Sequence, residues 1–209
     1  MITDATIALG ATCMAFATLH VVAEWRHWQT TRWLAKLAAS TAFVALAFAN
    51  GAASSVYGRI ILLALIFSWL GDMLLLSLQK TFLLAGIAAF FFAHLAYVIA
   101  FGSRPLDGDW FGIAFIILTI IGLATLWWLW KYLDKFYKIA VPLYLLAIVV
   151  MMSLAIATRS PLLAVAAIIF AVSDVSVARD RFVGQNIANK VWGIPLYYTA
   201  QLLLAMSLL

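Results

Sequence analysis

The chain of 209 residues is 67% hydrophobic and 10% charged, with a formal net charge of +5. An average soluble domain is roughly 45–50% apolar and about 25% charged. The composition therefore excludes an ordinary soluble enzyme, a disordered chain and a disulfide-rich secreted module, and it indicates a polytopic membrane protein. The positive charge is too dilute to indicate binding of nucleic acid. The single cysteine, Cys13, excludes an internal disulfide and a cysteine-based metal cluster.

Apolar segments long enough to cross a membrane recur along the whole chain. A spanning helix needs about 20 mostly apolar residues, and the runs are continuous rather than alternating, which argues against membrane strands. The N-terminus lacks a basic n-region, so we expect no cleaved signal peptide. We predict an all-α fold, in which residues 1–209 form a single integral membrane domain, a bundle of eight transmembrane helices. The predicted spans cover residues 5–23, 37–57, 59–79, 81–102, 110–130, 139–158, 161–179 and 191–208.

Lys and Arg are distributed unevenly among the predicted connections. Cytoplasmic loops of membrane proteins are enriched in these residues. We therefore predict that both termini lie on the non-cytoplasmic side of a bacterial cytoplasmic membrane. The first, third, fifth and seventh connections carry Arg26, Arg32, Lys36, Lys80, Lys131, Lys135, Lys138, Arg179, Arg181 and Lys190, whereas the others carry only Arg59, Arg104 and Arg159.

Three ionisable side chains lie well inside predicted spans, namely Asp72, His94 and Asp174. Such a group costs roughly 2.5–3.5 kcal/mol on insertion scales, so it is a functional candidate by default. Counting helical rise from the cytoplasmic edge places Asp72 at a depth of about 12 Å and Asp174 at about 7–8 Å. The same count places His94 deeper, at about 21 Å.

Further polar side chains reach this layer from several helices, which predicts a polar cavity open to the cytoplasmic leaflet. Asp72 and Asp174 are the candidate catalytic residues of this cavity. A structural role stays open, because a single Asp can serve as a hydrogen-bond partner between helices. Glu24 is expected to pair with Arg26 or with a lipid headgroup. The candidate substrate-binding residues are Lys36, Ser68, His94, Tyr144, Ser173, Tyr197, Tyr198 and Gln201.

Four motifs follow one another between residues 32 and 204. They are Ser68-Trp69-Leu70-Gly71-Asp72, Phe91-Phe92-Ala93-His94-Leu95-Ala96-Tyr97, Ser173-Asp174 with the later Arg179-Asp180-Arg181-Phe182, and Tyr197-Tyr198-Thr199-Ala200-Gln201-Leu202-Leu203. In order and spacing they resemble the YhhN family of membrane proteins, which includes the lysoplasmalogenases. One departure is Leu37, which follows Lys36 where the family often has proline. The resemblance implies eight helices and hydrolysis of an ether lipid, with a lysophospholipid as partner.

Two carboxyl groups suit the reaction that this resemblance implies. Hydrolysis of a vinyl ether needs a proton donor for the vinyl carbon and a second group that stabilises the oxocarbenium ion or activates water, as in glycoside hydrolysis. Asp174 lies nearer to water and to Arg179, which favours Asp72 as the proton donor, although the assignment stays open. Lys36, with Arg32 or Arg179, could hold the phosphate. The groups that could orient water and the glycerol hydroxyl are Tyr144, Tyr198 and Gln201.

Other chemistries receive less support from the sequence. The three histidines lie at different depths or outside the spans, which disfavours a zinc site, and no Gly-x-Ser-x-Gly elbow of a serine hydrolase is present. We therefore expect no cofactor. Two alternatives stay open, namely a transporter in which the aspartates bind protons or cations, and a hydrolase or binder of another lysophospholipid. The confinement of the polar groups to one half of the membrane favours an enzyme.

Overall fold

The computed structural model describes residues 3–77 and 79–209. Residues 1, 2 and 78 of the predicted domain lie outside the described part, and residue 78 belongs to the predicted third span. The secondary structure of the described residues is helical throughout, with turns between the helices. This part of the chain forms eight α-helices: α1 (Asp4–Arg26), α2 (Gln29–Ala49), α3 (Val56–Leu74), α4 (Lys80–Gly102), α5 (Gly108–Leu129), α6 (Tyr137–Ala157), α7 (Pro161–Ala178) and α8 (Ile187–Met206). The short turns η1 (Ala52–Ser54), η2 (Trp130–Tyr132) and η3 (Arg179–Val183) join some of them.

Seven of these helices, α1 to α7, are long and apolar enough to cross a membrane. The protein is thus a polytopic helical membrane protein. Helix α8 does not meet the same criterion, although it has 20 residues, because Asn189, Lys190 and Gln201 make it more polar. The eighth crossing therefore stays a prediction.

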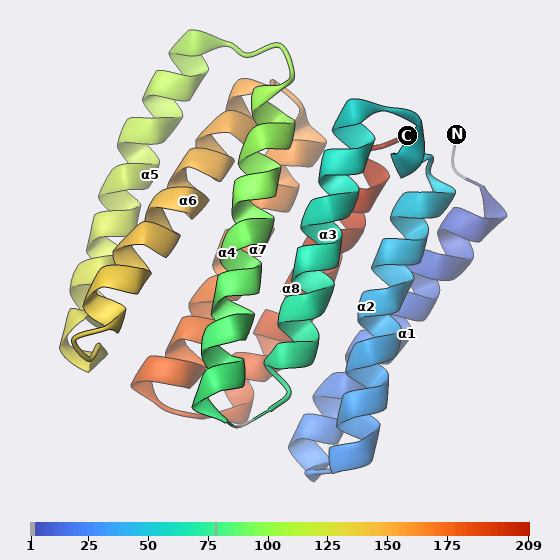
Figure 1. Ribbon diagram of the computed structural model, residues 1–209, viewed down its shortest axis with the longest axis vertical. Helices are drawn as coiled ribbons and strands as arrows, with labels where there is room; N and C mark the ends of the chain where they lie inside the picture. Colours follow the sequence, from blue (N-terminus) through green and yellow to red (C-terminus); the bar gives the residue numbers. More distant parts are fainter. Residues whose placement is uncertain (1–2, 78) are drawn as a thin grey trace.

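The helices alternate in direction, so that the connections fall at two ends of the bundle (Figure 1). The α1–α2, α3–α4, α5–α6 and α7–α8 connections lie at the lower end of the view, and both termini lie at the upper end. The lower end is therefore the one that carries most of the basic residues. Which side of the membrane it faces stays a prediction.

The second and third helices differ most from the predicted spans. Helix α2 begins at Gln29 rather than at residue 37 and ends at Ala49 rather than at 57. The predicted boundary is wrong because it was placed after the charged side chains, whereas Arg32 and Lys36 lie inside the helix and face a cavity. Helix α3 ends at Leu74, so Asp72 lies in its last turn.

Side-chain caps explain where several helices begin. Ser55 accepts a hydrogen bond from the backbone N–H of Gly58, and Ser160 accepts one from Leu163 ahead of Pro161 at the start of α7. Asn186 caps α8 in the same way. Such caps satisfy backbone donors that a helix start leaves free. The cap at Asn186 separates the start of α8 from the preceding turn, η3.

Small residues allow close contact between the helices that carry the polar side chains. A Cβ atom on Gly71 would lie 2.6 Å from the ring of Phe90, so α4 packs closely against α3 one residue before Asp72. Gly193 leaves no room for a side chain beside Ser176, which brings α8 against α7. Small residues have this role in many membrane proteins. Helix α5, by contrast, buries only Ala114 and Leu129 and packs chiefly against α6.

Candidate active site

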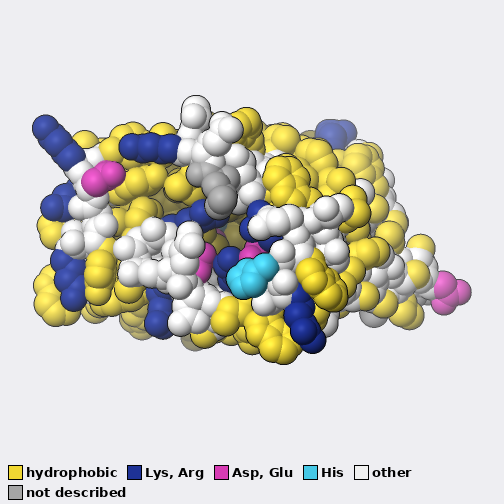
Figure 2. Space-filling model, turned by 90° about the horizontal axis from the view of Figure 1, so that it is seen from below, with side chains coloured by type: hydrophobic (Ala, Val, Ile, Leu, Met, Phe, Trp, Pro, Cys, Tyr) yellow, Lys and Arg dark blue, Asp and Glu magenta, His cyan; other side chains and the backbone are white. Residues whose placement is uncertain are grey.

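A cavity of about 650 Å³ opens at the lower end of the bundle. Figure 2, seen from that end, shows a hollow with acidic and basic side chains in it. Along α6 its lining runs from Tyr137 to Met152, about 22 Å at 1.5 Å per residue. The cavity is therefore long and has two kinds of wall. Near the mouth it is lined by Glu24, Arg32, Lys36, Asp72, Asp180, Arg181 and Lys190, whereas α5, α6 and α7 contribute Leu118, Ile121, Leu145, Ile148, Val149 and Val172.

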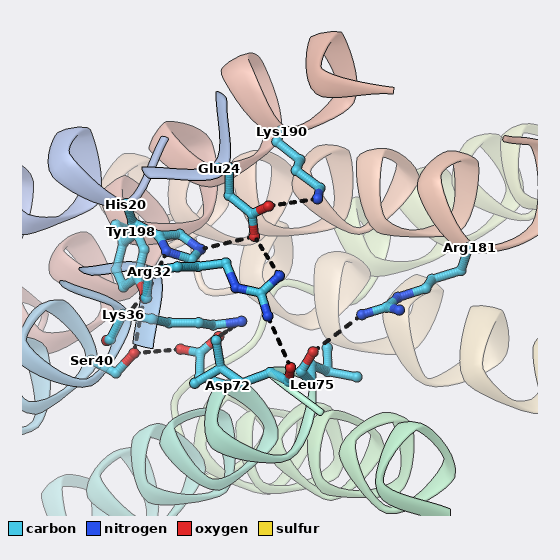
Figure 3. A network of polar contacts seen from close by, with 11 residues as sticks. His20, Glu24, Arg32, Lys36, Ser40, Asp72, Leu75, Arg181, Lys190 and Tyr198 are labelled. Carbon is cyan, nitrogen blue, oxygen red and sulfur yellow. Dashed lines mark hydrogen bonds and ion pairs between the residues drawn. The ribbon is translucent and has the colours of Figure 1, made fainter. Parts of the chain in front are cut away.

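Asp72 is surrounded by hydrogen-bond donors and a cation (Figure 3). Its Oδ2 atom accepts hydrogen bonds from Ser40 Oγ at 2.6 Å and from Tyr197 Oη at 2.7 Å. Lys36 Nζ lies 3.2 Å from Oδ1. The Asp72 side chain is only 3% exposed, and a buried carboxylate needs such compensation. These contacts fix the position of the Asp72 carboxylate at the cavity wall.

The hydroxyl of Tyr198 completes this cluster. It lies 3.2 Å from Ser40 Oγ and 3.5 Å from the carbonyl oxygen of Lys36. Lys36 and Ser40 are four residues apart and so share one face of α2. The Asp72 cluster thus joins α2, α3 and α8 at the wall of the cavity.

Asp174 has a different environment, formed by His94 and Tyr144. Its Oδ2 atom lies 3.2 Å from His94 Nε2 and accepts a hydrogen bond from Tyr144 Oη at 3.2 Å. The distance between Nε2 and Oδ2 is short enough for an ion pair. Among the described residues, however, Nε2 has no hydrogen-bond partner. Asp174 is 15% exposed and lines the cavity, whereas His94 is fully buried behind it.

The other ring nitrogen of His94 indicates where a proton lies. Nδ1 is 2.7 Å from the carbonyl oxygen of Phe90, and a carbonyl can only accept, so Nδ1 carries a hydrogen. The other ring nitrogen, Nε2, faces Oδ2 of Asp174. The Asp174–His94 pair thus places an imidazole nitrogen beside a carboxyl group at the cavity wall.

This contact corrects the depth expected for His94. Counted from the chain, His94 should lie deeper than both aspartates, yet it reaches Asp174. The helices do not end at one height, because the chain continues from α7 through η3 to Val183 before it turns. Asp174 therefore lies farther from the end of the bundle than a count from Arg179 indicates.

Three of the predicted binding residues lie behind the wall rather than on it. Ser68 and Gln201 are fully buried, as is His94, and none of them lines the cavity. Gln201 Oε1 accepts a hydrogen bond from Tyr97 Oη at 2.9 Å. The other predicted site residues all line the cavity: Lys36, Asp72, Tyr144, Ser173, Asp174, Tyr197 and Tyr198.

The cations at the mouth are arranged differently from the prediction. Arg179 is exposed and does not line the cavity, so it is not placed beside Asp174. Glu24 pairs with Lys190 at 2.8 Å and with Arg32 at 3.7 Å, rather than with Arg26. These ion pairs thus connect the end of α1 with the beginnings of α2 and α8.

Ser40 and Arg181 were missed as site residues. The spacing from Lys36 could have indicated Ser40, because the two side chains share a helix face. Nothing in the sequence separates Arg181 from Arg179, since only the π-helical turn η3 decides which one faces inward. Within residues 3–77 and 79–209, no group of three or more His, Cys, Asp or Glu side chains could hold a metal ion.

Comparison with known proteins gives a family and one related enzyme. The chain is 29% identical over 158 residues to the protein named lysoplasmalogenase TMEM86A of Bos taurus, a match that covers 70% of this chain. It covers 64% of that relative, so part of the relative has no counterpart in the match. No solved structure matches. The model of the YhhN family matches residues 31–208, and the chain therefore belongs to the YhhN family.

Proposed function

We propose that this protein is a membrane-embedded hydrolase of the lysoplasmalogenase type. It cleaves the vinyl ether bond of a lysophospholipid to give a fatty aldehyde and a glycerophospho-headgroup. The observation that carries the proposal is the cavity, which has charged and hydroxyl groups at its mouth and hydrocarbon walls along α5, α6 and α7. A lipid with one chain has the matching parts, namely a polar headgroup and a single hydrocarbon chain. The family and the related lysoplasmalogenase support this substrate class.

The dimensions of the cavity also suit a single chain. The hydrocarbon core of a bilayer is about 30 Å thick, so one chain occupies roughly half of it. The lining along α6 extends over about 22 Å, from Tyr137 near the mouth to Met152. We place the mouth at the cytoplasmic leaflet of a bacterial cytoplasmic membrane, because the basic connections lie at that end.

We assign Asp174 as the proton donor, which reverses the preference drawn from the sequence. Asp174 lines the cavity with its Oδ2 atom 3.2 Å from His94 Nε2, and Tyr144 donates a hydrogen bond to the same carboxylate oxygen. No hydrogen bond from a described residue reaches its Oδ1 atom, which leaves that oxygen available to a ligand. The proton is transferred to the vinyl carbon that does not carry the ether oxygen. The double bond becomes a single bond, and an oxocarbenium ion forms at the carbon that carries the oxygen.

Asp72 supports the later steps in this account. Its carboxylate, fixed by Lys36, Ser40 and Tyr197, provides a negative charge at the wall where positive charge develops on the substrate. Water then adds to the oxocarbenium ion and returns a proton to the Asp174–His94 pair. The hemiacetal collapses to the aldehyde and the free glycerol hydroxyl, so one water is consumed and no cofactor is needed.

A transporter fits the cavity less well. A carrier for protons or cations needs polar groups along a path through both halves of the membrane. Above Tyr144, the residues of α6 that line the cavity are Leu145, Ile148, Val149 and Met152, all of them apolar. Such walls suit a hydrocarbon chain better than an ion.

The proposal is tested with purified protein in detergent. The substrate is a lysophospholipid with a vinyl ether, and the matched control is the same lipid with a saturated alkyl ether. We expect fatty aldehyde from the vinyl ether alone, because only a vinyl carbon can be protonated to an oxocarbenium ion. Absence of aldehyde with folded protein, or equal cleavage of both lipids, would contradict the proposal.

A further inference from the structure

Two arginines reach the backbone at the mouth of the cavity, where α3 ends (Figure 3). Arg32 from α2 donates a hydrogen bond through Nη2 to the carbonyl oxygen of Leu76 at 3.3 Å. Arg181 from η3 donates one through Nη2 to the carbonyl oxygen of Leu75 at 3.2 Å. Because these two leucines are consecutive, the guanidinium groups are held at neighbouring points. Both arginines line the cavity.

These arginines differ from the two lysines of the same lining. Lys36 is paired with Asp72 at 3.2 Å, and Lys190 is paired with Glu24 at 2.8 Å. Each lysine is therefore neutralised by a close carboxylate.

The arginines have much weaker compensation. Within the described part of the chain, Arg32 has only one ion pair, a longer contact of 3.7 Å with Glu24, which Lys190 already occupies. Arg181 makes no ion pair with any residue that the structure describes. Its neighbour Asp180 accepts a hydrogen bond from the backbone N–H of Asn186 instead. The part of the mouth that the structure describes thus holds two guanidinium groups without a close carboxylate partner.

The arginines also have unused hydrogen-bond donors. A guanidinium group carries five N–H donors, and Arg32 Nε is buried without a hydrogen-bond partner among residues 3–77 and 79–209. A buried donor without a partner costs free energy that a ligand can recover. A planar guanidinium group matches two oxygens of a phosphate at once.

We propose that Arg32 and Arg181 bind the phosphate of the substrate headgroup. The proposal rests on the proposed function and deepens it, since it names the part of the lipid that is recognised at the mouth. It replaces Lys36 and Arg179 as the expected phosphate ligands, because Lys36 is committed to Asp72 and Arg179 is exposed outside the cavity. The phosphate belongs to a lipid rather than to a soluble ion, because the cavity continues from the arginines into hydrocarbon walls.

The kinetic test compares two substrates with the same vinyl ether chain. One is the lysophospholipid, and the other is the alkenylglycerol, in which a hydroxyl replaces the phosphate-bearing group. For Arg181→Gln we expect the ratio of kcat/KM between the two to fall about 10- to 100-fold, mainly through KM of the phospholipid. The matched control is Arg179→Gln, two residues away and exposed, which should keep the ratio. An unchanged ratio in Arg181→Gln would overturn the proposal.

A binding test separates this proposal from the function itself. The probes are an alkyl-ether lysophospholipid, which is not cleaved, the matching alkylglycerol and glycerol phosphate, each titrated calorimetrically in detergent. We expect Arg181→Gln to weaken the phospholipid about 10- to 100-fold more than the alkylglycerol. If the wild type cleaves no vinyl ether, this difference still decides the phosphate site. Equal weakening would overturn the site, and tight binding of glycerol phosphate would overturn its assignment to a lipid headgroup.

Arg181→Lys keeps the test decisive if Arg181→Gln does not fold. Lysine retains the positive charge and can still donate to the carbonyl oxygen of Leu75, but it lacks the planar fork. We expect a smaller fall in the same ratio, in the same direction. If the kcat/KM ratio of a folded Arg181→Lys protein equals that of the wild type, the forked contact of Arg181 with phosphate is overturned.

Discussion

The two aspartates of the cavity differ in what surrounds them, although both lie near the end of a membrane helix. Asp72 is held by a lysine and two hydroxyl groups and is almost fully buried. Asp174 is partly exposed to the cavity and is paired with a histidine and a tyrosine. A buried carboxylate that holds an ion pair and two hydrogen bonds contributes to the packing of three helices, whereas one that faces the cavity beside a histidine can contact a ligand. We therefore expect substitutions at Asp72 to affect stability and activity together, and substitutions at Asp174 to affect activity alone.

The largest expected effect is that of Asp174→Asn on turnover. General acid catalysis by a placed side chain contributes about 10²- to 10⁴-fold, so aldehyde release should fall by about 1,000-fold. The amide can still accept from Tyr144, so the thermal midpoint in detergent should stay close to that of the wild type. A folded Asp174→Asn protein with more than a tenth of the wild-type rate would remove Asp174 as the proton donor.

Asp72→Asn should reduce the stability as well as the activity. The change leaves Lys36 buried without its partner, and breaking a buried ion pair costs about 3–5 kcal/mol. Its thermal midpoint should therefore fall clearly below that of Asp174→Asn.

The double variant Lys36→Met/Asp72→Leu is the control for this effect. It removes both charges, and apolar replacement of a buried ion pair is often neutral for stability. The thermal midpoint should recover while aldehyde release stays low. Recovery of activity in the double variant would show that the negative charge of Asp72 is not needed for turnover.

His94→Asn should lower aldehyde release by about 100-fold, within the range for acid–base partners. The asparagine amide can replace Nδ1 as the donor to the carbonyl oxygen of Phe90, but it does not supply Nε2 toward Asp174. Measurement of the rate against pH is informative, because loss of an ionisable imidazole 3.2 Å from the proposed proton donor should change the profile as well as the maximum. A profile of unchanged shape would assign His94 a packing role.

Two tyrosine variants are expected to have the smallest effects, and they compare the two aspartates one hydrogen bond at a time. Tyr144→Phe removes one hydrogen bond to Asp174, and Tyr197→Phe removes one to Asp72. A hydrogen bond to a charged group contributes about 1.5–3 kcal/mol. We expect Tyr144→Phe to lower turnover about 10-fold with little change in thermal midpoint, and Tyr197→Phe to lower the midpoint. The reverse pattern would contradict the roles given to the two aspartates.

The fold was largely predictable because apolar segments determine where helices lie. Runs without charges gave most of the helices to within a few residues. The predicted span is wrong at α2, because Arg32 and Lys36 lie inside the helix, where they line a cavity and pair with Glu24 and Asp72. A count of residues between charges cannot distinguish a charge at the membrane edge from one inside a polar cavity.

The site was predictable in its residue types and less so in its pairings. Asp72 and Asp174 were identified because charged groups are costly in a membrane. The partners of each were not, since lateral neighbours depend on how helices pack, which hydropathy does not encode. The pairs Lys36–Asp72 and His94–Asp174 therefore required the structure, as did the inward turn of Arg181.

In the proposed reaction, a proton from the Asp174–His94 pair is added to the vinyl carbon. Turnover of the vinyl ether lysophospholipid in D₂O, with immediate reduction of the aldehyde to its alcohol, tests it most directly. Protonation by an exchangeable group predicts one deuterium on the carbon next to the former aldehyde carbon, formed about 1,000-fold more slowly by Asp174→Asn. An aldehyde without deuterium at that carbon, or one formed equally fast by the folded variant, would contradict the account.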